Sequence, residues 1–182
     1  MLRVLRFVAG AAVGIAIWWY ATPAYDALLC SALHLVGVAA EPLGRTVTVT
    51  RIGTLPIHVP ADQLTYNFIL FAGLVAAMPP RIWRGIVAFL ALCIAHAIAL
   101  YTTIEATYAL HAGAYSESHY SSLAQDFWKS AEFIYRIGGM FAISFVCWYA
   151  ATRVGARESQ PETSRESARR APARRKAPKA RR

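Results

Sequence analysis

Cys93 and His96 are the residues whose type and spacing most suggest chemistry. They are spaced i, i+3 in an apolar segment, so both lie on one side of a helix. An imidazole can activate a thiol by accepting its proton, and both side chains can bind metals. The alternative that we favour is structural: a buried histidine bonded to a neighbouring helix, beside a cysteine that acts as a small hydrophobic residue. Cys147, in a later apolar segment, is a second candidate thiol.

Arg136 is the candidate cation, because a charge inside an apolar segment is costly unless it is paired. Glu132, one helical turn earlier, is its expected partner, and binding of a carboxylate or phosphate is the functional alternative. The three cysteines of the chain share no spacing typical of a metal site or of a disulfide framework. We therefore expect no metal and no cofactor, and we assign no catalytic residue beyond these candidates.

A further group of residues is expected to pack helices together or to contact a partner. Gly10 and Gly14 form a GxxxG pattern, which lets two membrane helices approach closely, although chance in an Ala/Gly-rich run explains it equally well. Gly138 and Gly139 give a later helix a small face. Asn67 opens an apolar run and is expected to cap or cross-link helices.

The elements that carry these residues are hydrophobic segments. Hydrophobic residues make up 57% of the 182 residues and charged residues 16%, which indicates a polytopic membrane protein. Residues 64–107 predict a helical hairpin, two apolar runs around a break at 78–84. Pro79 and Pro80 cannot continue a helix, and the arginines and tryptophan that follow suit lipid headgroups. We expect this turn on the cytoplasmic side.

The segment before this hairpin predicts a first span and an extracytoplasmic region. Residues 7–20 follow two arginines and favour an uncleaved anchor, with a signal peptide as the alternative. Residues 25–40 predict an amphipathic helix on the outer surface. Alternating Val and Thr in residues 45–59 predict a small β-hairpin, whose second arm is confined to an edge position by Pro56.

The segment after the hairpin predicts one more span and a tail. Ser122 and Gln125 resemble a capping box, so a helix is expected to run from there to about Thr152. The tail from Arg153 holds eleven Lys and Arg against three Glu and few large apolar residues, which predicts disorder. Anionic lipid is its expected partner. Nucleic acid is not expected, because no aromatic residues for base stacking are interleaved with the charges.

These segments predict an all-α polytopic membrane protein with four transmembrane helices and a small extracytoplasmic β-hairpin between the first and second. Residues 1–152 form the membrane domain, and residues 153–182 form a disordered basic cytoplasmic tail. Placing both termini in the cytoplasm puts most Lys and Arg on the inner side, as the positive-inside rule requires.

One family has the same order of features. An N-terminal anchor precedes a Thr/Val-rich outer segment, the run Tyr66-Asn67-Phe68-Ile69-Leu70, and the break Ala76-Ala77-Met78-Pro79-Pro80-Arg81-Ile82-Trp83-Arg84, after which two more spans follow. This order, across residues 18–151, resembles the exosortase-associated membrane proteins, in particular the exosortase H-associated type. The resemblance implies the bacterial inner membrane and an accessory role beside an exosortase, a polytopic enzyme of surface-protein sorting.

The resemblance also bears on activity. The resemblance implies a comparison with the sorting enzymes themselves, whose catalytic pattern is an intramembrane Cys, then an Arg, then a His in chain order. Here Cys93 is followed by Arg136, but no histidine follows Arg136, since the last is His119. This favours a partner that binds another integral membrane protein over an enzyme. A small membrane thiol enzyme of the peptidase or transpeptidase type and a transporter subunit are the alternatives.

Overall fold

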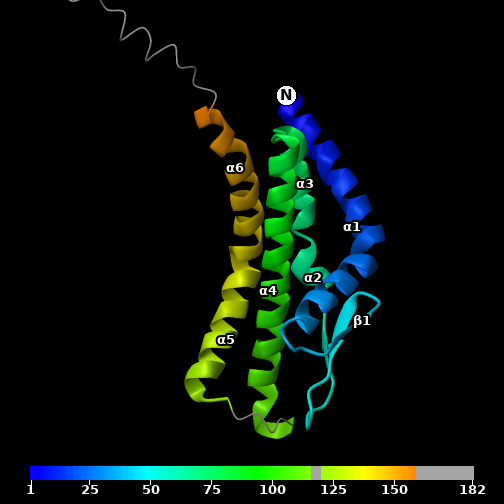
Figure 1. Ribbon diagram of the computed structural model, residues 1–182, viewed down its shortest axis with the longest axis vertical. Helices are drawn as coiled ribbons and strands as arrows, with labels where there is room; N and C mark the ends of the chain where they lie inside the picture. The colour runs from blue at the N-terminus through cyan, green and yellow to red at the C-terminus, as the bar shows by residue number, and fades with distance from the viewer. Residues whose placement is uncertain (116–119, 159–182) are drawn as a thin grey trace, which may run out of the picture.

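The computed structural model describes residues 1–115 and 120–158. It is mostly helical, and three of its helical stretches are long and apolar enough to cross a membrane: residues 2–34, 82–111 and 122–153. They form an elongated bundle with a small sheet at the end away from the N-terminus (Figure 1). This arrangement is compatible with the multi-pass membrane protein that the sequence predicts.

The first helix, α1 (Leu2–His34), is longer than expected. The predicted division into a span over 7–20 and a separate helix over 25–40 is wrong, because one helix continues through Pro23. Proline cannot donate to the carbonyl four residues earlier, which bends a helix without always ending it. The second half of α1 accordingly turns back toward the bundle (Figure 1).

The strands predicted from the Val/Thr alternation are present. They form an antiparallel sheet in the order β1-β2-β3, with bounds Ala40–Leu43, Thr46–Val49 and Ile57–Val59. Val47 and Val49 of β2 are buried, and Thr48 lies on the other face, where its hydroxyl meets His58. The strand after Pro56 lies at an edge, as predicted.

The sheet has one strand more than the predicted hairpin. Strand β1 contains Glu41 and Pro42, which directly follow the segment predicted as a helix over residues 25–40. Proline is tolerated there because β1 is the other edge strand and its missing N–H interrupts no interior ladder. Gly44, with a φ of 65°, makes the tight turn from β1 into β2.

The apolar run over 64–78 is a broken segment and not a single span. It contains the short helix α2 (Asp62–Thr65) and the ten-residue helix α3 (Phe68–Ala77). Ten residues rise about 15 Å, half of a hydrocarbon core of roughly 30 Å. After the two prolines, α4 (Ile82–Tyr115) begins and continues beyond residue 107, where the predicted hairpin ends.

The last helical stretch consists of three elements in sequence. They are α5 (Ser122–Ile134), the π-helix η1 (Tyr135–Gly139) and α6 (Met140–Glu158). The N-cap is Ser121, one residue before the predicted Ser122, and its side chain accepts from the Ala124 N–H at 3.2 Å. Helix α6 passes the predicted end at Thr152. Residues 159–182, most of the predicted tail, lie outside the described residues.

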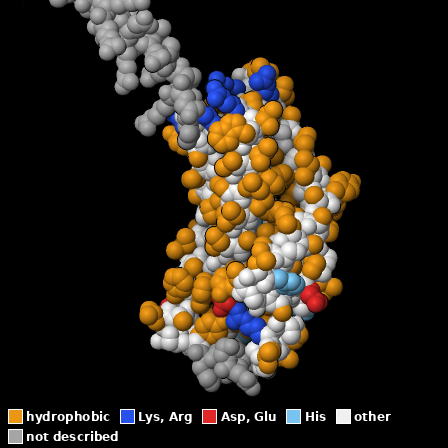
Figure 2. Space-filling view, in the orientation of Figure 1, with side chains coloured by type: hydrophobic (Ala, Val, Ile, Leu, Met, Phe, Trp, Pro, Cys, Tyr) orange, Lys and Arg blue, Asp and Glu red, His pale blue; other side chains and the backbone are white. Residues whose placement is uncertain are grey.

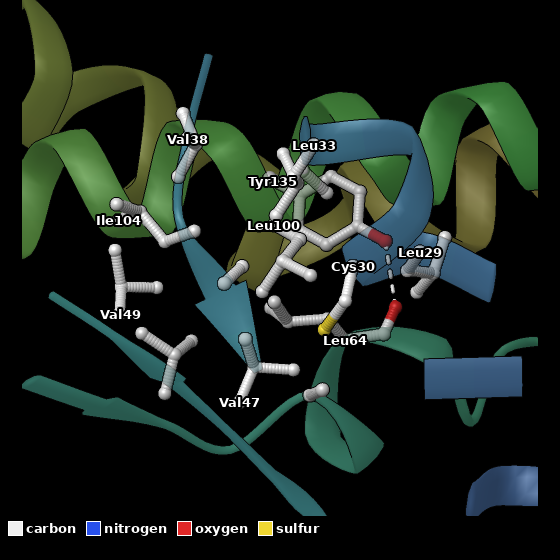
Figure 3. Packing of buried hydrophobic residues seen from close by; sticks show 14 of the residues in the cluster. Leu29, Cys30, Leu33, Val38, Val47, Val49, Leu64, Leu100, Ile104 and Tyr135 are labelled. Carbon is white, nitrogen blue, oxygen red and sulfur yellow. Dashed lines mark hydrogen bonds between the residues drawn. The ribbon is translucent and has the colours of Figure 1, made fainter. Parts of the chain in front are cut away.

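The larger buried cluster lies where the second half of α1, the sheet and α4 meet. Figure 3 shows the side chains of Leu33, Val47 and Val49 packed beside Leu100 and Ile104. The sheet therefore has a core of its own at one end of the helical bundle. A smaller cluster, Phe71, Ala88, Leu92 and Ala151, joins α3, α4 and α6 nearer the other end.

The GxxxG pattern of α1 faces α3 of the same chain. A Cβ added at Gly10 would lie 2.9 Å from the Ala72 carbonyl oxygen, and one added at Gly14 would lie 2.9 Å from the Ala72 Cβ. Both distances are shorter than the contacts that real Cβ atoms make with other heavy atoms. These glycines therefore allow the close contact that holds the short α3 against α1.

We expect Gly10→Leu to lower the free energy of unfolding by roughly 1–3 kcal/mol, because the added side chain must push α1 and α3 apart. Thermal unfolding in detergent measures the effect. Gly138→Ala is the matched control, since nothing lies within 4 Å of a Cβ at that glycine. Equal melting temperatures for the two variants would contradict the close approach of α1 and α3.

Candidate functional site

Asn67 is the centre of a polar cluster inside the helical bundle. It lies at the break between α2 and α3, it is fully buried, and its side chain makes no helix cap. Its amide nitrogen instead donates to the Met140 carbonyl at 2.7 Å, and the Ser144 hydroxyl donates to the Asn67 main-chain carbonyl at 3.2 Å. The predicted role of Asn67 in cross-linking helices thus takes the form of a link to α6.

His96 of α4 is held between two partners. Its Nε2 lies 2.7 Å from the side-chain oxygen of Asn67, and its Nδ1 lies 2.7 Å from the Tyr25 hydroxyl of α1. Because the amide nitrogen of Asn67 already donates to a carbonyl, its oxygen faces His96 and must accept. A neutral ring with its hydrogen on Nε2 satisfies both bonds, and the Tyr25 hydroxyl donates to Nδ1.

The structure does not join Cys93 to His96 directly. The Cys93 side chain lies beside the Tyr25 hydroxyl, whose hydrogen is directed at His96. Tyr25 therefore stands between the thiol and the imidazole. The resulting chain runs from Cys93 through Tyr25 and His96 to Asn67, and we call these four residues, with Ser144, the polar cluster. Sequence reasoning missed Tyr25, because its distance from the α4 residues along the chain leaves no spacing signal.

The π-helix positions the polar cluster from the other side. The Tyr135 hydroxyl in η1 donates to the Leu64 carbonyl of α2 at 2.8 Å, the bond drawn in Figure 3. Met140, the first residue after η1, supplies the carbonyl that Asn67 bonds. Both contacts satisfy groups at the α2–α3 break. π-Turns are frequent at functional sites, but they have no sequence signature that could have predicted this one.

The remaining candidates lie apart from the polar cluster. Arg136 pairs with Glu132 at 2.9 Å, as its spacing predicts. Cys147 lies in a groove between α4 and α6. A Cβ added at Gly139 would lie 3.0 Å from the Ile134 carbonyl oxygen of the preceding turn. Within residues 1–115 and 120–158, no group of three or more His, Cys, Asp and Glu side chains is placed to hold a metal.

A second polar site ties the sheet to α4 and α5. Glu105 is buried and pairs with Arg51 from the loop after β2. The Tyr120 hydroxyl donates to Glu105 at 2.6 Å, and the Arg51 guanidinium lies 4.4 Å from the Tyr108 ring centroid. Burial lowers the pKa of Arg51, but the bond to Glu105 outweighs it and leaves that pKa above its ordinary value. Burial and the Glu105 carboxylate raise the pKa of Tyr120.

Asp26 is the least satisfied polar residue of the described chain. It is 0% exposed, and neither of its carboxylate oxygens has a hydrogen-bond partner. Two charges of opposite sign influence it, those of Asp62 and Arg45. The sequence suggested a solvent-facing position, because we placed Asp26 on a surface helix. The turn of α1 at Pro23 instead directs it inward.

We expect Asn67→Ala to destabilise the protein by roughly 1–3 kcal/mol, because the substitution leaves His96 Nε2–H without its acceptor inside the bundle. Unfolding of the purified protein, followed by tryptophan fluorescence, measures this change. Thr102→Ala is the control, since that hydroxyl donates to the Ile98 carbonyl within its own helix. A melting temperature unchanged in Asn67→Ala would mean that the polar cluster does not hold the bundle together.

We expect Asp26→Asn to stabilise the protein by roughly 1–3 kcal/mol at pH 8, because it removes a buried charge that no hydrogen bond compensates. The exposed Asp126 of α5 provides the matched control, Asp126→Asn, for which little change is expected. Thermal unfolding of both variants against the wild type is the measurement. A large loss of stability in Asp26→Asn would show that the carboxylate makes a contact essential to folding.

The comparisons with known proteins give no relative for this chain. No family model, no curated protein and no solved structure matches it. The resemblance to the exosortase-associated proteins therefore still depends on the motifs quoted above, and the function has to be argued from the geometry.

Proposed function

We propose that this chain is an accessory protein of the bacterial inner membrane that binds another integral membrane protein. The expected partner is an exosortase-type sorting enzyme. The observation that supports this proposal is an apolar face on α5 that no other part of the described chain covers. We call the residues of this surface the outer apolar face; on α5 they are Leu123, Phe127 and Ile134, and on α6 they are Phe141 and Phe145.

The outer apolar face is strongly exposed. Helix α5 has no buried residue, and Leu123 and Phe127 are 80% and 59% exposed. The opposite side of α5 packs on α4, where Trp128 meets Tyr101 with ring centroids 5.9 Å apart. Hydrophobic side chains gather over α5 at the lower left of Figure 2. Exposed apolar residues that align over several turns indicate an interaction surface more than isolated ones do.

The length of the helix places part of this face outside the lipid. The stretch from Ser122 to Arg153 contains 32 residues, whereas a hydrocarbon core of roughly 30 Å needs about 20. If Arg153 marks one headgroup layer, most of α5 extends beyond the other. Lipid can cover the apolar face on α6 but not the face on α5. A partner that covers both must itself be embedded in the membrane and extend out of it.

The proposal includes four membrane crossings with both termini in the cytoplasm. The short α3 and the turn after it form the second crossing together with α2. The support is the charge distribution: Lys and Arg gather at the end where the N-terminus, the α3–α4 turn and the end of α6 lie (Figures 1 and 2). The positive-inside rule assigns such an end to the cytoplasm.

Reporter fusions test this topology. We expect fusions after Trp83 and after Arg157 to report the cytoplasm, and a fusion after Thr54 to report the outside, because the chain must change sides at every crossing. An alkaline phosphatase and fluorescent protein pair gives opposite signals on the two sides. A fusion after Trp83 that reports the outside would exclude the four-span arrangement.

Co-purification tests the partner. We expect the wild-type chain to co-purify with a co-expressed exosortase from the same bacterium. Leu123→Glu combined with Phe127→Glu should reduce the recovered enzyme about tenfold, a loss of roughly 1.4 kcal/mol, because two carboxylates would enter an apolar contact. Lys129→Glu on the same helix changes the charge by the same amount and should have little effect.

Two outcomes of this experiment would contradict the proposal. One is an exosortase that does not co-purify with the correctly inserted wild-type chain. The other is equal recovery of the enzyme with the double variant and with Lys129→Glu, which would mean that the outer apolar face is not the contact surface.

A thiol enzyme is the second candidate, and one observation favours it. In the polar cluster, Tyr25 links the Cys93 thiol to His96, and Asn67 orients the imidazole. A histidine oriented by an asparagine is the arrangement that activates the nucleophile in some cysteine proteases. In a sorting assay, loss of function in both Cys93→Ala and Tyr25→Phe, with Cys147→Ala active, would establish this candidate. An accessory protein should tolerate all three substitutions once it is inserted.

A further inference from the structure

A groove of about 740 Å³ lies between α1, α3 and α4 near the basic end of the bundle (Figure 1). Small and apolar side chains form most of its walls: Ala9, Gly10 and Val13 on α1, and Ala72, Val75 and Ala76 on α3. The charged residue of the lining is Arg6, an exposed residue of α1. We propose that this groove binds one anionic phospholipid, with an acyl chain along the apolar walls and the phosphate at Arg6. This inference does not depend on the proposed partner.

The lining residues of α1 form one continuous stripe. Arg6, Ala9 and Val13 are spaced i, i+3 and i+7, which places them on one side of the helix. Arg6 comes first in this stripe, so its guanidinium lies at one end of the groove and the apolar walls extend from there into the bundle. A phospholipid has the same two parts, a charged headgroup and an apolar chain.

The depth of the groove matches one leaflet of a bilayer. From Arg6 to Val13, α1 rises about 10 Å, and the ten residues of α3 rise about 15 Å. One half of a hydrocarbon core of roughly 30 Å has the same depth. The rings of Phe68 and Phe89, with centroids 6.0 Å apart, lie at the far end, and beyond them α1 lines only a smaller cavity of about 90 Å³. An acyl chain occupies one leaflet, whereas a transmembrane helix must cross both, so the depth favours a lipid.

The charge around the groove favours an anionic headgroup. The sequence contains no Asp or Glu before Asp26, nor between Asp62 and Glu105, so the parts of α1, α3 and α4 that line the groove contribute no carboxylate to repel a phosphate. Arg3 near the N-terminus and Arg81 in the α3–α4 turn add positive charge at the same end (Figure 1). An arginine presents donors in a planar fork that matches phosphate oxygens. Basic pockets between membrane helices are a known form of anionic-lipid site.

Native mass spectrometry of the full chain in detergent tests the proposal. We expect phosphatidylglycerol to bind about tenfold more tightly than phosphatidylcholine with the same acyl chains. Arg6→Gln should abolish that preference. Arg3→Gln is the matched control, because it removes the same charge from an exposed position of the same helix that does not line the groove. Truncation after Glu158 removes most basic residues of the tail and should leave the preference intact.

A second pair of variants tests the apolar part of the groove. Ala9→Trp keeps every charge and fills the groove from an exposed position, so it should weaken phosphatidylglycerol binding about tenfold. Val8→Trp places the same ring on the exposed surface of α1 outside the groove and should bind like the wild type. The unfolding temperature shows that each variant is folded. Inorganic phosphate should not compete with the lipid, because it leaves the apolar walls uncovered.

Five results would each overturn the proposal. Three concern the charge: equal binding of the two lipids, equal effects of Arg6→Gln and Arg3→Gln, or loss of the preference upon tail truncation. The other two concern the apolar walls: equal binding in Ala9→Trp and Val8→Trp, or competition by inorganic phosphate.

Discussion

The break between α2 and α3 is the constraint on which the rest of the structure depends. A chain that bends inside a hydrophobic layer exposes main-chain carbonyls that no water can satisfy. Here the Tyr135 hydroxyl reaches the Leu64 carbonyl, and the Ser144 hydroxyl reaches the Asn67 carbonyl. The Asn67 side chain then binds His96 and the main chain of α6. The irregular segment thus joins α4, η1 and α6 through the hydrogen bonds that it needs for its own stability.

Local patterns in the sequence predicted much of the fold, because their physical causes are local. Alternating Val and Thr in β2 require one buried and one open face, and two consecutive prolines must end a helix wherever they occur. The Arg136–Glu132 pair follows from the spacing of one helical turn. The hydrophobic stretches that form α1, α4 and α6 follow from composition alone.

Features that depend on contacts between distant segments could not be predicted in the same way. The sequence around Pro23 is compatible with either a helix end or a bend in a continuous helix. In the structure the helix continues and bends, and its second half packs against the sheet. The bend also buries Asp26. Strand β1 forms because it can pair with the edge of β2, although Glu41 and Pro42 have a low intrinsic preference for β-strands. For the polar cluster, sequence spacing indicated Cys93 and His96, but Tyr25 and the role of Asn67 arise only when three helices meet.

The π-helix η1 has a geometric consequence for the protein surface. A π-turn accommodates one extra residue, which rotates everything before it by about 100° relative to everything after it. The backbone is helical from α5 through η1 to α6, and η1 determines how the side chains of α5 are rotated about the helix axis relative to those of α6. A single-residue deletion in η1 would leave both helices intact and rotate α5 about its own axis relative to α6. Leu123 and Phe127 would then point in a different direction relative to Phe145. The count of residues in one turn thus determines the direction in which the exposed side chains of α5 point.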